Sequence, residues 1–261
     1  MVQVDYQDFI AAIKKLYVQN PCRVSSIAFW KLEQLCRESD TYSVTNKGHT
    51  YHYAIRNQRL EFYWSTDRLH FLLTPNEIES LEFLVLHNDF YGLIAEKLVG
   101  YEVRESHPLL YDFALSQRGG SSDEFFIADF DFAREQDCEV AADMLNRCYE
   151  THLHSAAEVA GWCELPVFDE SLWLWVRSRA SKEAVGLGIS TYQASIRECY
   201  LDWIQVLPEY QGQGLGRLLV SETIRRAIGK SDIIRVTGMV DDFYQKCGFA
   251  ETESWRIINK R

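Results

Sequence analysis

Three glycines, Gly212, Gly214 and Gly216, alternate between a strand-like segment that ends at Pro208 and a helical segment. Such a turn leaves several backbone N–H groups free at the positive end of the helix dipole, where they can surround a pyrophosphate. Because glycine has no side chain, a phosphate can approach the backbone closely. The spacing therefore predicts an anion site in this turn.

Three ligand classes use such a turn, and the spacing distinguishes them. A dinucleotide-binding turn ends G-x-G-x-x-G, but counting from Gly212 the last position is Arg217. A nucleoside-triphosphate loop ends in Lys followed by Ser or Thr, and no such pair follows these glycines. The first class is disfavoured and the second is excluded.

The spacing that fits is Q-x-x-G-x-G, filled by Gln211, Gly214 and Gly216. The pattern L-x-x-I-x-V-x-P precedes it from Leu201, and the stretch Phe243-Tyr-Gln-Lys-Cys-Gly-Phe249 follows it in the expected order. In these motifs the chain resembles the GCN5-related N-acetyltransferase (GNAT) superfamily, from about residue 125 to residue 260. The resemblance implies an acyl-CoA N-acyltransferase fold in the C-terminal half, and transfer of an acetyl group from acetyl-CoA to an amine.

The resemblance also implies how the acetyl donor binds. Backbone N–H groups of the turn hold the pyrophosphate, and the pantetheine arm pairs with a splayed strand like an additional strand. The implied cofactor-binding residues are Ile204, Gln205, Val206, Gln211, Gly212, Gln213, Gly214, Leu215, Gly216, Arg217 and Tyr244.

The chemistry implied by the resemblance needs a proton donor and a proton acceptor. Tyr244 is expected to protonate the departing coenzyme A thiolate, and a backbone N–H near Val206 to stabilise the carbonyl oxygen. For the base, the candidates are Glu198 and Asp202 beside the central strand and Glu164 further upstream. Each of these three carboxylates also fits a surface or capping role.

Two stretches depart from the family pattern. An Asn and an Ala-rich turn often precede the tyrosine-bearing helix in the family, whereas this chain has the shorter Thr237-Gly-Met-Val-Asp-Asp242. Related peptide N-terminal acetyltransferases can carry a Glu on the preceding strand, which here reads Ile233-Ile-Arg-Val236. A ribosomal-protein type of substrate is therefore not supported.

The segment from Tyr149 to Phe168 is expected to form the acceptor wall, because the corresponding region covers the thioester in this superfamily. It contains His152 and His154, which alternate in a polar loop. Alternating histidines in such a loop are expected to face solvent, and no further ligand set is apparent. We therefore expect no metal.

Composition limits the partners. The formal net charge of −11 opposes binding to phosphate backbones and suits a cationic small molecule or basic peptide, so no nucleic-acid partner is expected. The seven cysteines form no CxxC pair and are expected to be reduced thiols. The N-terminus has no basic, apolar signal pattern, and no apolar run is long enough to span a membrane. A cytoplasmic location without membrane contact is expected.

The stretch Gln117–Ser122 has linker composition and divides the chain into an N-terminal α+β domain, residues 1–118, and a GNAT domain, residues 123–261. The overall fold class is therefore mixed α+β. In the first half, apolar spacing predicts two helices and then a three-stranded meander. The predicted ranges are 6–18 and 28–36 for the helices, and 52–55, 60–64 and 68–73 for the strands.

In the second half, the sequence predicts one strand, then an amphipathic helix, then three further strands. The predicted ranges are 125–130, 172–177, 185–190 and 199–206 for the strands, and 135–149 for the helix. The stretch Asp89–Tyr101 faintly echoes the closing motif around Tyr244, and two interpretations of the first half stay open. One is a degenerate GNAT-like half that has lost cofactor binding. The alternative is an unrelated α+β cap that shapes the acceptor pocket or a homodimer contact.

Three functional readings stay open. The leading one is an acetyltransferase acting on a small-molecule or peptide amine. The second is a non-catalytic sensor that binds acetyl-CoA for regulation; retention of Tyr244 and the lack of a basic DNA-binding segment favour the enzyme. The third is an enzyme for a longer acyl thioester, because cleft size decides acyl length.

Overall fold

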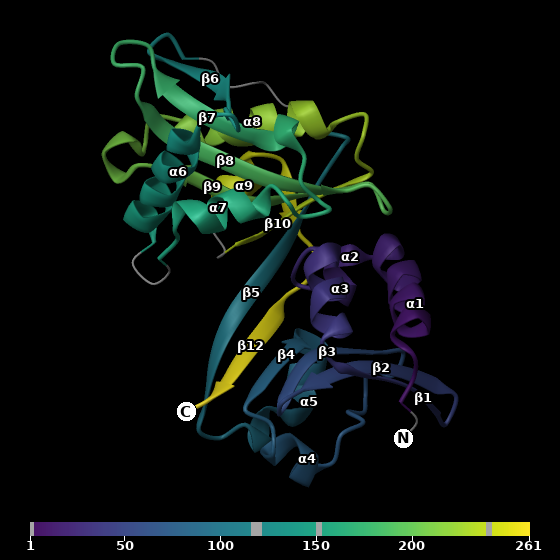
Figure 1. The fold of residues 1–261 in the computed structure, drawn as a ribbon. Coiled ribbons are helices and arrows are strands. Elements are labelled where there is room, and N and C mark those ends of the chain that lie inside the picture. Colours follow the sequence, from purple (N-terminus) through teal and green to yellow (C-terminus); the bar gives the residue numbers. More distant parts are fainter. Residues whose placement is uncertain (1–2, 116–121, 150–152, 239–241) are drawn as a thin grey trace. The chain divides into compact units, whose positions relative to one another are not determined.

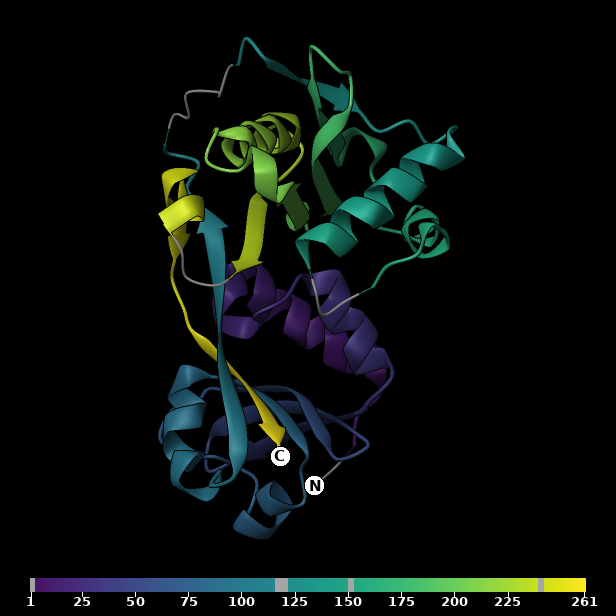
Figure 2. The same cartoon turned by 90° about the vertical axis from the view of Figure 1, so that its left-hand side faces the viewer.

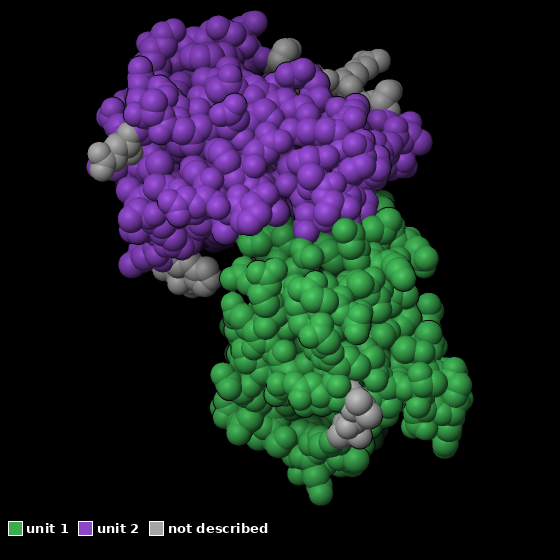
Figure 3. Space-filling model, turned by 45° about the vertical axis from the view of Figure 1, so that its right-hand side comes forward, with its two compact units in different colours: residues 1–110, 237–241, 250–261 green, residues 111–236, 242–249 purple. Residues whose placement is uncertain are grey.

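The computed structural model describes residues 3–115, 122–149, 153–238 and 242–261. The chain forms two compact units, coloured separately in Figure 3. The N-terminal unit comprises Met1–Leu110, Thr237–Asp241 and Ala250–Arg261, and the C-terminal unit comprises Tyr111–Val236 and Asp242–Phe249. The predicted linker lies, except for Ser122, outside the described residues.

The N-terminal unit is built on a sheet with the strand order β1-β2-β3-β4-β12-β5 (Figure 1). The C-terminal strand β12 runs antiparallel between β4 and β5. The strands are β1 (Asp40–Asn46), β2 (His49–Arg56), β3 (Arg59–Ser65), β4 (Phe83–His87), β5 (Tyr101–Tyr111) and β12 (Trp255–Lys260). The helices are α1 (Tyr6–Gln19), α2 (Pro21–Val24), α3 (Phe29–Arg37), α4 (Pro75–Glu79) and α5 (Asn88–Ile94).

The two predicted N-terminal helices are confirmed as α1 and α3, but the predicted meander is wrong by one strand. The segment 68–73 is not a strand, and the missed strand is β1. The carboxylate of Asp67 explains the difference, since it accepts hydrogen bonds from the backbone N–H of Leu69 and the hydroxyl of Tyr51. These bonds turn the chain directly after β3.

The C-terminal unit contains a second sheet with the order β10-β9-β8-β7-β6. Its five strands are β6 (Phe125–Asp129), β7 (Trp173–Ser178), β8 (Ala184–Gln193), β9 (Glu198–Val206) and β10 (Ile233–Gly238), and β11 (Phe249–Glu251) follows near the chain end. The helices are α6 (Glu135–Cys148), α7 (Ala156–Trp162), α8 (Leu215–Ala227) and α9 (Asp242–Lys246). The predicted helix and the four predicted strands of this half are confirmed within one residue at each end, except that β8 continues three residues beyond its predicted end.

Helices α6 and α8 cover opposite faces of this sheet (Figure 2). The alternation of side chains along β7 shows this arrangement, since Trp173 and Trp175 join the core under α6 while Leu174 and Val176 join the core under α8. Within the described residues, no helix is long and apolar enough to cross a membrane.

Two glycines of β8 let α8 approach the sheet closely. A Cβ atom on Gly188 would lie 3.2 Å from the side chain of Leu219, and one on Gly186 would lie 3.1 Å from the backbone oxygen of Gln205. Leu219 belongs to α8 and is fully buried. The distance between α8 and the sheet therefore depends on the absence of side chains at Gly186 and Gly188.

Gly188→Val should lower the free energy of unfolding by about 1–3 kcal/mol, because the added methyl groups overpack the contact with Leu219. Denaturant unfolding followed by tryptophan fluorescence measures this change. The matched control is Gly92→Ala in α5, where a Cβ atom meets nothing within 4 Å. It should be neutral or stabilising by about 0.4–1 kcal/mol. Equal stability of Gly188→Val and the unchanged chain would contradict the packing argument.

Candidate functional site

The glycine turn joins β9 to α8. Gly212 and Gly214 have left-handed φ angles of +77° and +79°, which glycine adopts without strain, and Gly214 is the N-cap of α8. A Cβ atom on either glycine would meet nothing within 4 Å, so the backbone is open on this side. The first turn of α8 has no acidic residue, and Arg217 is exposed there. The turn therefore has the geometry and charge of an anion site.

Gly216 has a different role from the other two glycines. A Cβ atom there would lie 3.0 Å and 3.1 Å from two ring carbons of Phe243, so α9 packs directly on the first turn of α8. The neighbouring Tyr244 is half-buried, and its ring makes an edge contact with that of Phe243 at 4.9 Å between centroids. The structure thus brings the helix of Tyr244 next to the glycine turn. Sequence reasoning assigned Gly216 only to the turn and missed this packing.

Strand β9 separates from β10 before it reaches the turn. The parallel register of the two strands runs from Glu198 and Ile233 to Leu201 and Val236, and then ends. On its other edge, β9 stays paired with β8 as far as Val206. Within the described residues, the last part of β9, from Trp203 to Val206, therefore has one edge outside this ladder. An extended ligand can hydrogen-bond to such an edge.

Asp202 lies where the strands separate. Ile189 and Ser190 are consecutive on β8, but they pair with Trp203 and Leu201, so Asp202 is the extra residue of a β-bulge in β9. Its carboxylate is half-buried and accepts a hydrogen bond of 2.8 Å from the hydroxyl of Thr191.

The other two candidate bases lie elsewhere. Glu198 begins β9, eight residues and roughly 26 Å of strand before Val206. It is 1% exposed, and its carboxylate lies 3.6 Å from the guanidinium of Arg235, which is fully buried. Glu164 is exposed in the turn after α7. Of the three carboxylates, Asp202 is the one that the structure places at the strand separation.

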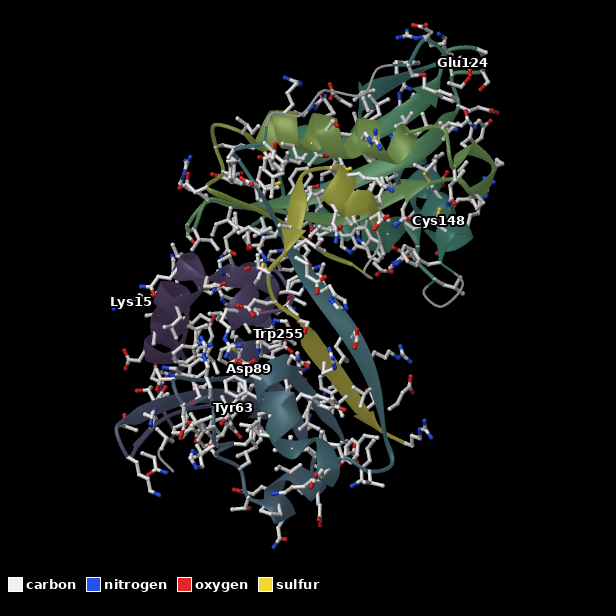
Figure 4. The ribbon with its side chains drawn as sticks, turned by 180° about the vertical axis from the view of Figure 1, so that it is seen from behind. Lys15, Tyr63, Asp89, Glu124, Cys148 and Trp255 are labelled. Atoms are coloured by element: carbon white, nitrogen blue, oxygen red, sulfur yellow. The ribbon has the colours of Figure 1, made fainter. Side chains whose placement is uncertain are left out.

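Several predicted cofactor-binding residues hold the turn itself. The side-chain amide of Gln211 donates a hydrogen bond of 3.1 Å to the carbonyl oxygen of Val206. The thiol of Cys148, labelled in Figure 4, donates to the same oxygen at 3.8 Å, and burial raises the pKa of this thiol. The side chain of Leu215 is buried, so only its backbone faces the turn, whereas Gln213 is exposed.

Aromatic rings cover the face of β9 beside the separation. We call the four residues Tyr149, His154, Trp162 and Trp203 the aromatic wall. The indoles of Trp162 and Trp203 stack at 5.9 Å between centroids with an interplanar angle of 8°. Tyr149 contacts Trp203 at 5.5 Å, and its hydroxyl accepts a hydrogen bond of 2.9 Å from the side chain of Gln205.

The expectation that His154 faces solvent is wrong. Its side chain is 9% exposed, and its ring makes edge contacts with Trp162 at 5.4 Å and with Trp203 at 5.1 Å. The second histidine, His152, lies outside the described residues, as do residues 239–241 of the shortened turn. Among the described residues, no group of three or more His, Cys, Asp or Glu side chains could hold a metal ion.

Comparison with known proteins identifies the fold. Residues 167–251 match the family model of the acetyltransferase (GNAT) domain. No curated protein sequence matches the chain significantly.

Several solved structures are similar over nearly the whole chain. A GCN5-related N-acetyltransferase from Sphaerobacter thermophilus has a TM-score of 0.70 and 13% identity, covering 99% of this chain and 94% of that one. A GNAT-family acetyltransferase from Colwellia psychrerythraea has a TM-score of 0.63 and 10% identity, covering 100% and 99%. A tandem GNAT protein from the clavulanic acid biosynthesis pathway has a TM-score of 0.64 and 9% identity, covering 98% and 96%.

At these identities the similarity shows the fold. The mixed α/β structure has the GNAT fold in its C-terminal half, and the likeness to a tandem GNAT protein fits an architecture of two halves. Together with the family match, this shows that residues 167–251 match a GNAT acetyltransferase domain within a chain that has the fold of GNAT proteins.

Proposed function

We propose that this protein transfers an acetyl group from acetyl-CoA to a primary amine of a small molecule or peptide by direct attack. One observation supports this most strongly. The paired register of β9 with β10 ends at Leu201, and a short 3-10 turn, Pro208–Tyr210, connects the end of β9 to a left-handed glycine turn at the N-terminus of α8. A free strand edge that leads to an anion site suits a long ligand with an amide-containing arm and a pyrophosphate.

Each part of the donor has a counterpart in this unit. The N–H groups of the first turn of α8 and the exposed Arg217 suit the pyrophosphate, because positive partial and full charges converge there. The free edge from Ile204 to Val206 suits the amide groups of the pantetheine arm. The carbonyl of Val206 already accepts from Gln211 and, at the longer distance of 3.8 Å, from the thiol of Cys148, so the weaker thiol contact gives way when the arm binds.

The transfer needs a stabilised oxyanion and a proton for the leaving thiolate. As the amine attacks the thioester carbon, negative charge develops on the carbonyl oxygen, and a backbone N–H near Val206 stabilises it. The hydroxyl of Tyr244 gives its proton to the thiolate as the carbon–sulfur bond breaks. Among the three carboxylates considered as the base, Asp202 is the one that lies at the strand separation.

The function is tested by calorimetric binding of acetyl-CoA, followed by thiol release with polyamines, aminoglycosides, amino acids and short peptides. Micromolar binding with acceptor-dependent thiol release supports the transferase. Binding without release by any acceptor favours a non-catalytic sensor, and no binding contradicts the proposal. Propionyl-CoA and longer thioesters in the same assay test the acyl length.

Tyr244→Phe should lower kcat by about 10²- to 10⁴-fold and weaken acetyl-CoA binding much less, because the lost hydroxyl is the proton donor while the ring that lies beside the donor is kept. Stopped-flow thiol release and calorimetry measure the two quantities. Tyr42→Phe in the N-terminal unit is the matched control, since it also removes a half-buried tyrosine hydroxyl. An unchanged kcat in Tyr244→Phe would exclude Tyr244 as the general acid.

Gly214→Ala should weaken acetyl-CoA binding by about tenfold, because alanine is strained at a φ of +79° and the N–H groups of the turn would shift. Gly48→Ala is the matched control. Gly48 has a φ of +83° in the turn between β1 and β2, also with open space around its Cβ position. Gly48→Ala should lower the free energy of unfolding by a similar amount without changing the acetyl-CoA affinity measured by calorimetry. If Gly214→Ala and Gly48→Ala bound acetyl-CoA with equal affinity, the donor would bind outside the glycine turn.

A further inference from the structure

His154 occupies a rigidly held position in the aromatic wall. The side chain of Asn146 on α6 clamps its backbone from both sides: the amide oxygen accepts from the N–H of His154 at 2.7 Å, and the amide nitrogen donates to its carbonyl at 2.9 Å. The next residue, Ser155, caps α7 by accepting from the backbone N–H of Glu158 at 3.1 Å. These contacts fix both the histidine and the first turn of the helix beside it.

The two ring nitrogens of His154 have different surroundings. Nδ1 lies 3.0 Å from Oε1 of Glu158. A carboxylate can only accept, so Nδ1 carries the proton, and the neutral ring keeps a lone pair on Nε2. Nε2 is buried and has no hydrogen-bond partner among the described residues. A buried nitrogen with a free lone pair is uncommon in folded proteins and calls for a functional explanation.

The location of this nitrogen connects it to the proposed reaction. The imidazole lies against Trp203, which is the residue after the bulge at Asp202 and belongs to the part of β9 with a free edge. Of the described groups in contact with His154, Asn146 and the indoles of Trp162 and Trp203 are uncharged, and the carboxylate of Glu158 is the charged one. A positive charge on the ring would therefore be stabilised by Glu158.

We propose that His154, oriented by Glu158, is the base that takes the proton of the acceptor amine; this inference rests on the proposed acetyl transfer. Because Nε2 lies below the surface, one water molecule relays the proton from the ammonium group to it. The same arrangement of a carboxylate, an imidazole and a substrate proton orients the base in other acyl transfers.

The step balances as follows. The acceptor ammonium loses one proton through the water to Nε2, which leaves an imidazolium beside Glu158. The lone pair of the neutral amine forms the carbon–nitrogen bond at the thioester carbon, and the carbon–sulfur bond breaks. The thiolate takes the proton of Tyr244, and the nitrogen returns its second proton to that tyrosine. The products are the amide, the thiol and one proton on His154, which passes to solvent.

The experiment compares His154→Ala and His154→Gln with the full-length protein, using the best acceptor from the thiol-release panel. Both variants should bind acetyl-CoA as the unchanged protein does and lose about 10²- to 10⁴-fold in kcat. His70→Ala is the matched control, because the side chain of His70 is 77% exposed in the N-terminal unit. A kcat within twofold of the unchanged protein in both His154 variants would overturn the proposal.

Chemical rescue separates proton transfer from packing. Imidazole should restore turnover of His154→Ala, whereas pyrazole, which has the same size but is a much weaker base, should not. Rescue by both compounds shows that the ring only fills space and overturns the proposal. If His154→Ala does not fold, the pH profile of His154→Gln decides. Loss of an acid limb of kcat/KM in the range where imidazoles titrate supports the proposal, and its persistence overturns it.

Glu158→Gln tests the positioning role of the carboxylate. It should lower kcat by about tenfold, because the imidazolium formed in the reaction loses its counter-charge. Glu139→Gln on α6 is the matched control, as Glu139 is an exposed carboxylate. An acid limb that moves in Asp202→Asn and not in the His154 or Glu158 variants assigns the base to Asp202 and overturns the proposal. Absence of thiol release by the unchanged protein rejects both the transfer and this inference.

Discussion

The separation of β9 from β10 after Leu201 is the constraint on which the site depends. Backbone N–H and C=O groups must find partners, so a strand that leaves its neighbour has to face water, a side chain or a ligand. In the described part of this protein, the segment of β9 beyond the ladder with β10 runs from Trp203 to Val206 and ends before the glycine turn. The 3-10 turn Pro208–Tyr210 then leads to the glycine turn, where the N–H groups at the start of α8 provide a second set of backbone groups for a ligand.

Glycines serve two separate purposes around this edge. Gly212 and Gly214 give the turn its left-handed backbone. Gly186, Gly188 and Gly216 instead allow close approach: the first two seat Leu219 of α8 on the sheet, and the third seats Phe243 of α9 on α8. The helix that carries the anion site and the helix that carries Tyr244 are therefore positioned through missing side chains. A larger residue at any of the three would move the site without touching a ligand.

The sequence allowed the local parts of the site to be predicted, and long-range pairing determined the rest. The glycine turn and the helix of Tyr244 were predicted because their signals lie within a few consecutive residues. The bulge at Asp202 depends on the register of β9 against β8, which no local pattern specifies. The burial of His154 likewise depends on Trp203, about fifty residues later in the chain. An alternation of histidines in a polar segment gives no signal for such a partner.

Because both compact units contain segments from the C-terminal part of the chain, the protein cannot be cut into two folded fragments at one position. Strand β12 pairs with β4 and β5, and its residues Trp255 and Ile258 are buried in the N-terminal unit. The indole N–H of Trp255 donates to the carbonyl of Cys22 at 2.8 Å. A fragment cut at the predicted boundary, residues 123–261, would contain β12 without either of its partner strands. Unpaired apolar strands aggregate.

In sequence, α9 with Tyr244 lies between two segments that belong to the N-terminal unit. The chain therefore passes between the two units on both sides of α9, so a fragment of residues 123–261 corresponds to neither compact unit.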